Sequence, residues 1–564
     1  AEVCDLLVLP DGAAFPLRAE QNFKRFFKDG GRVITIGGYA FSQLIDSAGK
    51  VEEGAGLLGS NQPVECFSCL RYDPSTIPLF DEEYTYDGVV AVRPDENQTV
   101  FAGELDCSDA PLRGYSSVTV MGGNRGRWYP LLNGYNAIGE KCATIAAMMR
   151  LYNEQDPVDS GLETWKDYAS NSIAFFGVVN KDLFAPGNPE LRQGLCRLAR
   201  LMMRDVYIGH IDNLYNCYRQ GESPSFDIYI ENSSSSTVSG LVNLEIKDTA
   251  GGRMYSEEIP CSVPEKTSRR LTARWDTKTF EDDFYIVKAY VTDQSGDALD
   301  IYETGFSVWD DAVVADGPAY SFENNYINIV KNGVKTPIFA VGVDDAPEIM
   351  LLEWAQTPLA WRRDFIDRYD AGTQIYENLQ IYTWYPAFRA MLETPESKEK
   401  FFRKVDNVVY MAQKYRQIYM MGLAIGDNCA ITIDNLEFKR RFICEVVERY
   451  SKVPGIIYYL NGDLVVTLTP DLQPDYTRFL REKYRTDEAL CNAYGRQELT
   501  IDGMQLDCDY MLRAASWSDV HSDDIQRFRL HLVSRWIHVL AKTVRDRAGN
   551  EKAVLCEFYS WPSE

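Results

Sequence analysis

The stretch NGVKTPIFAVGVDD, from Asn332 to Asp345, decides the fold of the C-terminal half of the chain. It opens a series of alternating strand-like and helix-like segments that extends to VPGIIYYLNGD, from Val453 to Asp463. Apolar segments in this series end at polar or aromatic residues, which are Asp344 and Asp345, Trp384 and Tyr385, Asp427 and Asn428, and Asn461 and Asp463. In parallel β/α barrels the chemistry lies at the carboxyl ends of the strands. The pattern therefore predicts one rim of a (β/α)8 (TIM) barrel.

The predicted barrel occupies residues 313–564. Its expected strands are 336–343, 377–384, 417–426, 455–461 and 552–561, and its expected helices are 360–371, 397–415, 435–451, 474–495 and 523–549. Because a closed barrel of this kind needs eight strands, we expect an incomplete barrel, truncated after its fifth strand, in a chain that is part of a longer polypeptide. The alternative is that further strands lie in LVVTLTP (464–470) and LTIDGMQLD (499–507).

Composition excludes some classes of function. The 564 residues carry a net charge of −25, which argues against a nucleic-acid partner, because such binding depends on Lys and Arg. No apolar run reaches the length of a membrane-spanning helix, so no membrane partner is expected. The chain begins in a strand, without Met, so its compartment stays unknown; a soluble bacterial protein of the cytoplasm, periplasm or exterior is expected.

The cysteines and histidines do not predict a metal site or a cofactor. Thirteen cysteines are scattered along the chain, and the close pair Cys66 and Cys69 has no second pair or His pair at zinc-site spacing. Among four histidines, His531 and His538 alone could share one helix face. We therefore expect no metal, no cofactor and mostly buried free thiols.

Residues 1–207 predict a doubly wound sheet. A strand at Cys4–Gly12, a helix at Ala19–Gly30 and a strand at Arg32–Phe41 form a βαβ unit. This segment resembles the flavodoxin-like, glutamine-amidotransferase-like domain of β-galactosidase relatives, where it serves trimerisation. The resemblance implies a homo-oligomer assembled through this domain. The turn Gly37–Ala40 lacks the nucleophilic Cys of a working amidotransferase, so no glutaminase activity is expected.

Residues 208–312 predict an antiparallel, immunoglobulin-like β-sandwich. Turn residues separate short segments of alternating apolar and polar residues, which are SPSFDIYIEN, SGLVNLEIKD, SRRLTARWD, DFYIVKAYVTD and YETGFSVWD. No Cys-Trp-Cys framework is present, so the likeness to immunoglobulins is one of architecture. We interpret this domain as a spacer, with a carbohydrate-binding module as the alternative.

The C-terminal region resembles the β-galactosidase-like retaining glycosidases of the TIM-barrel clan. The resemblance rests on FLREKYRTDEALCNAYG (Phe479–Gly495) after the fourth strand, and on QRFRLHLVSRW (Gln526–Trp536) before the fifth. In that family the fourth strand ends in Asn-Glu, and the Glu is the acid/base. Here the strand ends in Asn461-Gly462-Asp463, which puts that role in doubt.

The resemblance implies two catalytic carboxylates. Asp463 is the candidate acid/base, with a turn residue as the alternative. Glu557 in CEFYSW is a candidate nucleophile, and a substrate-binding carboxylate or a structural residue are its alternatives. Candidate substrate-binding residues close the strands and are Asp344, Trp384, Tyr385, Asn428 and Asn461.

Three hypotheses for the function remain open. The chain is a glycoside hydrolase acting on β-linked glycans or oligosaccharides, with a carbohydrate substrate and a two-carboxylate mechanism. Alternatively, it is a non-catalytic glycan-binding or scaffolding relative that has lost the usual acid/base Glu. Thirdly, it is a truncated piece of an active enzyme.

Overall fold

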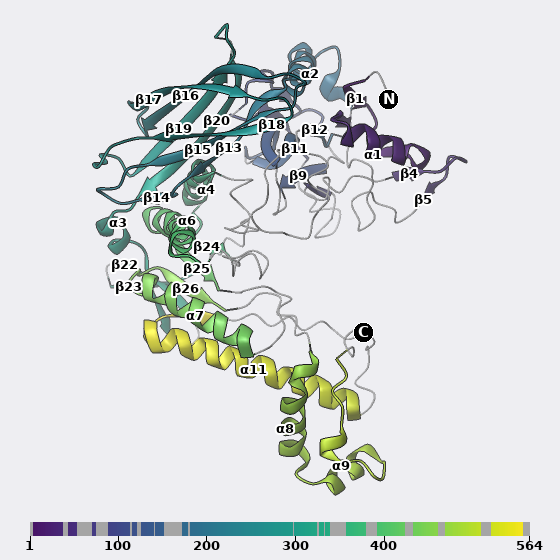
Figure 1. Cartoon of the computed structure of the whole chain (residues 1–564), viewed down its shortest axis with the longest axis vertical. Helices are drawn as coiled ribbons and strands as arrows, with labels where there is room; N and C mark the ends of the chain where they lie inside the picture. Colours follow the sequence, from purple (N-terminus) through teal and green to yellow (C-terminus); the bar gives the residue numbers. More distant parts are fainter. Residues whose placement is uncertain are drawn as a thin grey trace. The chain divides into compact units, whose positions relative to one another are not determined.

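The computed structural model describes most of the chain. The described residues are 4–37, 43–52, 70–74, 88–96, 98–112, 116–120, 126–139, 141–151, 172–178, 181–296, 298–323, 326–331, 333–338, 357–370, 372–378, 392–423, 433–460, 468–508 and 520–555. The chain divides into two compact units, residues 1–308 with 351–361, and residues 309–350 with 362–564 (Figure 1). The three predicted domains, with boundaries near 207 and 312, stay a prediction.

A seven-stranded sheet forms the N-terminal part of the first unit. Its order is β1-β3-β12-β11-β10-β7-β8, with bounds Leu6–Leu9, Arg32–Ile36, Ser172–Phe176, Lys141–Leu151, Gly126–Tyr135, Ala91–Pro94 and Leu105–Asp106. β1, β3 and β12 run parallel, and α1 (Glu20–Lys28) lies between β1 and β3 in the chain. The described residues therefore confirm the predicted strand–helix–strand unit.

The rest of this sheet differs from a doubly wound parallel sheet. β12, β11, β10, β7 and β8 pair antiparallel in that order, so the sheet is mixed. The reason is the long β10–β11 hairpin, whose turn is closed by a hydrogen bond from the Gly139 amide to the Asn136 carbonyl. A turn this short joins only antiparallel strands. Gly139 has φ +84°, a conformation that favours glycine.

Helix α2 (Pro189–Met202) packs on the seven-stranded sheet. Proline suits the first helical turn, where its missing N–H has no intrahelical partner. Leu191, Leu198 and Met202 of α2 are buried in one cluster with Ile34 and Phe176 of the sheet. The remaining strands of this part are β2 (Ala14–Pro16), β4 (Gln43–Ile45), β5 (Val51–Glu52), β6 (Leu70–Pro74) and β9 (Ser116–Val120).

The second part of the first unit is a β-sandwich, whose strands are labelled in Figure 1. One sheet has the order β13-β15-β18, with bounds Val206–Asn213, Ser225–Asn232 and Thr267–Arg274. The other has the order β14-β20-β19-β16-β17, with bounds Cys217–Tyr218, Ala298–Val308, Phe284–Thr292, Val238–Asp248 and Arg253–Val263. Alternate residues of β15 and β16 are fully buried between the sheets, as the period of two predicts. The sequence analysis missed β17, an edge strand in which only Cys261 and Val263 are buried.

Arginine side chains join the seven-stranded sheet to the sandwich. Arg127 of β10 donates to Asp300 of β20 at 2.6 Å and to the carbonyl of Ile208 at 3.1 Å. Its guanidinium also lies over the rings of Tyr129 and Tyr302, 4.1 and 4.6 Å from their centroids. The Asp300 carboxylate is 4% exposed and also accepts from the Ile208 amide at 2.9 Å. This contact is therefore a desolvated ion pair at the junction of the two sheets.

The second unit begins with a small antiparallel sheet. Its strands are β21 (Ala319–Glu323), β22 (Tyr326–Lys331) and β23 (Val334–Pro337), which follow the short helix α3 (Asp311–Ala315). A parallel sheet follows, with strands β24 (Ile375–Asn378), β25 (Ile418–Gly422), β26 (Ile456–Tyr459) and β27 (Val554–Leu555). Helices α4 (Pro358–Asp370), α6 (Pro395–Lys414), α7 (Ile433–Tyr450) and α11 (Val520–Ala548) alternate with these strands along the chain.

A helical module, residues 468–536, lies between β26 and β27 in the chain. It contains α8 (Gln473–Tyr484), α9 (Asp487–Tyr494) and the first half of α11. The single helix predicted over 474–495 is wrong, because the chain breaks at Arg485, which has φ +66°. The Thr486 hydroxyl then accepts from the Ala489 amide and caps α9. Residues 499–507 contain a 3-10 turn at Ile501–Gly503 and no strand.

Loss of the Arg127–Asp300 ion pair should destabilise the first unit. In Arg127→Met the Asp300 carboxylate stays buried without its cation, so we expect the free energy of unfolding to fall by about 3 kcal/mol. Chemical denaturation of the protein measures this change. The matched control is Lys288→Met, which breaks the pair that Lys288 forms with Glu303 at 2.9 Å, both about one-third exposed. We expect a loss below about 1 kcal/mol there, and equal losses in the two variants would contradict the burial argument.

Candidate functional site

The parallel sheet of the second unit carries the candidate site. Its strands pair in chain order, β24 with β25, β25 with β26 and β26 with β27, all parallel. The register is Ile375 opposite Ile418, Met420 opposite Ile457, and Tyr459 opposite Leu555. Because parallel neighbours need a crossover, helices separate these strands in the chain. The carboxyl ends of all four strands therefore meet at one edge of the sheet.

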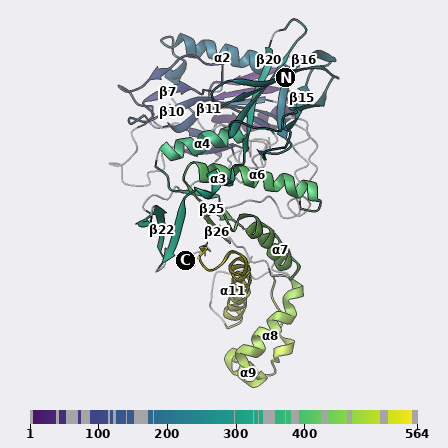
Figure 2. The same ribbon diagram turned by 90° about the vertical axis from the view of Figure 1, so that its left-hand side faces the viewer.

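The two faces of this sheet have different partners. Ile375, Ile418, Met420, Ile457 and Tyr459 form one apolar cluster, against which side chains of the antiparallel sheet pack, including Ile327 and Ile329. Figure 2 shows the β22 hairpin beside β25 and β26. The alternate residues of β25 and β26, including Tyr419 and Tyr458, are buried outside this cluster. Both faces are apolar, as expected for a parallel sheet within a β/α fold.

Polar contacts fix the amino ends of β26 and β27. The Tyr320 hydroxyl donates to the Ile456 carbonyl at 2.8 Å and accepts from the Ala553 amide at 2.9 Å. The Lys552 ammonium donates to the Val453 carbonyl at 2.5 Å, in the turn before β26. Burial lowers the pKa of Lys552 to about 8, while Glu551 acts in the opposite direction. These contacts hold the fifth predicted strand in register with the fourth.

All seven predicted site residues lie outside the described residues, namely Asp344, Trp384, Tyr385, Asn428, Asn461, Asp463 and Glu557. Six of them follow the carboxyl ends of β24, β25, β26 and β27 in the chain. Asp344 differs, because the described residues before it belong to β23, which pairs antiparallel with β22. The predicted first barrel strand, 336–343, is described only to Ile338, and its residues up to Pro337 belong to that antiparallel sheet.

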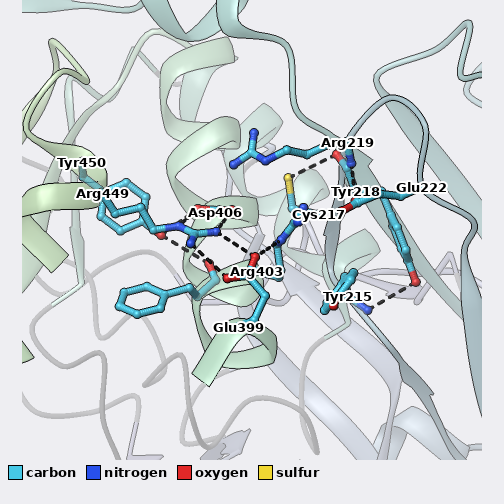
Figure 3. A network of polar contacts seen from close by, with 11 residues as sticks. Tyr215, Cys217, Tyr218, Arg219, Glu222, Glu399, Arg403, Asp406, Arg449 and Tyr450 are labelled. Carbon is cyan, nitrogen blue, oxygen red and sulfur yellow. Dashed lines mark hydrogen bonds and ion pairs between the residues drawn. The ribbon is translucent and has the colours of Figure 1, made fainter. Parts of the chain in front are cut away.

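An ion network centred on the buried carboxylate of Asp406 links the helices α6 and α7 (Figure 3). Arg449 donates to both oxygens of Asp406 at 2.9 and 2.6 Å and to Glu399 at 3.2 Å. The Tyr450 hydroxyl donates to Asp406 at 2.8 Å. Burial opposes the charge on Glu399, but the hydrogen bonds from Arg449 and Arg403 prevail and lower its pKa. The network joins two helices that follow neighbouring strands, and no local pattern in the sequence predicts it.

A second buried carboxylate holds the helical module together. Asp524 of α11 is fully buried and accepts from the hydroxyls of Tyr484 at 2.9 Å and Tyr494 at 2.6 Å. The Lys483 ammonium also donates to Asp524. Burial raises the pKa of Tyr484 to about 12, and the bond to Asp524 acts in the same direction. This carboxylate therefore ties α8 and α9 to the first half of α11.

Within the described residues, no three His, Cys, Asp or Glu side chains come together in an arrangement that would hold a metal ion. None of the described helices combines the length and apolar character needed to cross a membrane.

Comparisons with known proteins give partial structural similarity. No family model matches the chain, and no curated protein matches it. A solved β-glucuronidase 2 of Bacteroides uniformis is 12% identical over 62% of this chain and 34% of its own, with a TM-score of 0.23. A Parabacteroides merdae β-glucuronidase is 12% identical over 50% of this chain and 32% of its own, with a TM-score of 0.21. A Pseudomonas fluorescens alkylpurine DNA glycosylase covers 21% of this chain and 34% of its own, at 14% identity and a TM-score of 0.16.

The chain thus spans about a third of the length of these three structures. Two of the three are β-glucuronidases. TM-scores of this size do not establish a common fold.

The Lys552 contact should make stability depend on pH. Between pH about 8 and the ordinary lysine value of 10.5, the unfolded chain holds this proton and the folded chain does not. Folding is therefore favoured increasingly as pH rises through this window. In Lys552→Met this contribution disappears. The melting temperature of the wild type should therefore rise relative to that of the variant between about pH 7.5 and about pH 9.5.

The matched control for this measurement is Lys542→Met, which removes an exposed lysine from α11. Its melting profile should run parallel to that of the wild type. A Lys552→Met profile that is also parallel would show that Lys552 does not titrate in this window.

Proposed function

We propose that this chain is a glycoside hydrolase, or part of one, that acts on β-linked glycans or oligosaccharides in the manner of β-galactosidases. The observation that carries the proposal is the chain-order pairing of β24, β25, β26 and β27. Polar or aromatic candidate residues follow the carboxyl end of each of these strands. In β/α barrels this edge carries the catalytic groups. The resemblance at Phe479–Gly495 and Gln526–Trp536 supplies the reaction class.

The proposed mechanism uses Asp463 as acid/base and Glu557 as nucleophile. Tyr459 and Leu555 are opposite each other in the β26–β27 register. Asp463 follows β26 in the chain and Glu557 follows β27, so the two carboxylates come after strands that pair. Retaining hydrolysis needs two carboxyl groups about 5–5.5 Å apart, and inversion needs about 6.5–9.5 Å. The resembled glycosidases are retaining enzymes, so we propose retention.

The other candidate residues would bind the sugar. Trp384 and Tyr385 offer flat apolar faces for a sugar ring, with polar atoms at their edges. Asp344, Asn428 and Asn461 offer acceptors and amide donors for hydroxyl groups. Together these groups suit a neutral carbohydrate.

A second candidate function is glycan binding or scaffolding without catalysis. It is favoured by Asn461-Gly462-Asp463, where the resembled family has Asn-Glu. Asp is one methylene shorter than Glu, so its carboxyl group reaches less far toward the glycosidic oxygen. This function needs the same substrate-binding residues but no proton transfer at Asp463.

Substitution of the two carboxylates separates these functions. Asp463→Asn should abolish hydrolysis of alkyl β-galactosides and largely spare that of 2,4-dinitrophenyl β-galactoside, because a good leaving group needs little acid assistance. Glu557→Gln should abolish both, because the nucleophile is needed for every substrate. Steady-state rates with the two substrates measure this difference.

Wild-type protein that binds a β-galactoside but hydrolyses neither substrate would favour the non-catalytic function. Equal loss on both substrates in Asp463→Asn would contradict its role as acid/base. Circular dichroism of each variant controls for misfolding.

The N-terminal part is proposed to mediate assembly and to lack glutaminase activity. The support is the missing Cys at Gly37–Ala40 together with the resemblance to a trimerisation domain. Light scattering should give a mass that is a multiple of 64.2 kDa. A strictly monomeric protein, or ammonia release from glutamine, would contradict the respective half of this prediction.

A further inference from the structure

An open groove of about 790 Å³ lies between α8 and α11 in the helical module. Its lining includes Phe479 and Lys483 of α8. From α11 it includes Asp523, Arg527, Leu530 and His531. None of these residues belongs to the predicted catalytic edge, and the sequence resemblance assigns them no role.

The direction of α11 places this groove on the catalytic side of the parallel sheet. β26 ends before the module and β27 begins after α11, so α11 runs from the carboxyl-end side back to the amino-end side. α7 makes the same return between β25 and β26. α7 has 18 residues and α11 has 29, which correspond to about 27 Å and about 43 Å of helix.

The extra length of α11 is at its N-terminal end. Near the C-termini of the two helices Arg547 of α11 pairs with Glu448 of α7. Further up, Lys439 of α7 lies over the ring of Trp536, 5.4 Å from its centroid. The part of α11 before His531 therefore extends past the first turn of α7, beyond the carboxyl ends of the strands. Figure 1 shows α7 beside one end of α11 and α8 beside the other.

The groove combines aromatic surface with ordered polar groups. The rings of Phe479 and His531 lie 5.9 Å apart at 48°. Leu530 is 59% exposed. The Arg527 Nε donates to both oxygens of Asp523 at 2.8 Å, which fixes the plane of the guanidinium, and Lys483 lies 3.2 Å from the same carboxylate. An apolar ring face beside planar, oriented donors and acceptors is suited to a pyranose, whose own faces are apolar and whose edges carry hydroxyls.

The charge balance favours a neutral ligand. Asp523 is paired with both Arg527 and Lys483, and Lys483 is also bound to the buried Asp524. An anionic ligand would have to displace a carboxylate that already holds these cations. Hydroxyl groups, in contrast, add to the remaining donors and acceptors without breaking the ion pairs.

We propose that the α8–α11 groove is a distal subsite that binds outlying sugar units of a neutral, β-linked oligosaccharide. This inference rests on the proposed function, because it takes the carboxyl edge of the parallel sheet as the place where the glycosidic bond is held. Phe479 and His531 supply the surface on which a sugar ring lies. Arg527, with Asp523, hydrogen-bonds its hydroxyls.

The test compares Arg527→Ala with Lys542→Ala on the same helix. Both substitutions remove one exposed partner of an i,i+4 ion pair, Arg527–Asp523 in the groove and Lys542–Asp546 outside it. Binding of β-1,4-linked tetrasaccharides of galactose, glucose and N-acetylglucosamine is measured by calorimetry on the full chain. We expect at least one tetrasaccharide to bind, and Arg527→Ala to weaken it by about tenfold, the loss of one charge-assisted hydrogen bond. Lys542→Ala should leave its affinity unchanged.

A second measurement separates this inference from the proposed function. Hydrolysis of 4-nitrophenyl β-glycosides of the same three sugars reports on the catalytic edge alone. If these are cleaved but Arg527→Ala and the wild type bind every tetrasaccharide equally, the hydrolase stands and the subsite is overturned. If nothing is cleaved but Arg527→Ala weakens tetrasaccharide binding tenfold, the subsite is supported and the proposed hydrolase activity is overturned.

Absence of tetrasaccharide binding to the wild type overturns the subsite. If the groove instead binds a second copy of the chain, Arg527→Ala should lower the mass measured by sedimentation and leave the affinity for the sugar unchanged. That result would also overturn the proposed subsite. Phe479→Leu, which keeps an apolar side chain against the core, is a second variant expected to weaken binding.

Discussion

The parallel pairing of β26 with β27 is the constraint on which the candidate site depends. The chain leaves β26 at Tyr459 and returns to pair with it at Val554, after a helical module with its own apolar core. A loop of this length has a substantial closure entropy, although the entropy grows only slowly with length. The Tyr320 hydroxyl offsets it, because it donates to the Ile456 carbonyl of β26 and accepts from the Ala553 amide just before β27. If this pairing slipped by one residue, the side chains of Val554 and Leu555 would change face.

The sequence predicted the bounds of single helices and strands well, but it did not predict the contacts between them. Helices α6 and α7 and strands β25 and β26 lie close to their predicted bounds, because apolar periodicity and capping are local properties. The β10–β11 hairpin was missed, although its Asn136–Gly139 turn was visible in the sequence, and it makes the first sheet mixed. The break at Arg485 was missed because no glycine or proline marks it. Only the hydroxyl of Thr486, which caps the next helix, pointed to it.

The candidate site was predictable only as a set of strand ends. Alternating strands and helices indicate which residues meet at one edge, so Asp463 and Glu557 follow strands that pair. The sequence could not reveal the groups that hold those strands in place. The Asp406–Arg449 pair joins residues that are 43 positions apart, and Lys483 and Asp524 are 41 apart. Such pairs depend on which helix faces meet, which periodicity alone does not specify.

Helix α11 links the helical module to the parallel sheet. α11 is one continuous helix whose second half packs along α7 and whose first half carries the core of the module. The groove residues Asp523 and Arg527 therefore belong to the same continuous helix that precedes β27 in the chain. Asp524, buried beside Asp523, binds the hydroxyls of Tyr484 and Tyr494 and so aligns α8 with this helix. Loss of these donors would leave a buried carboxylate without hydrogen bonds, which would strongly destabilise the folded module. The residue that secures the module is therefore the direct neighbour of one that lines its groove.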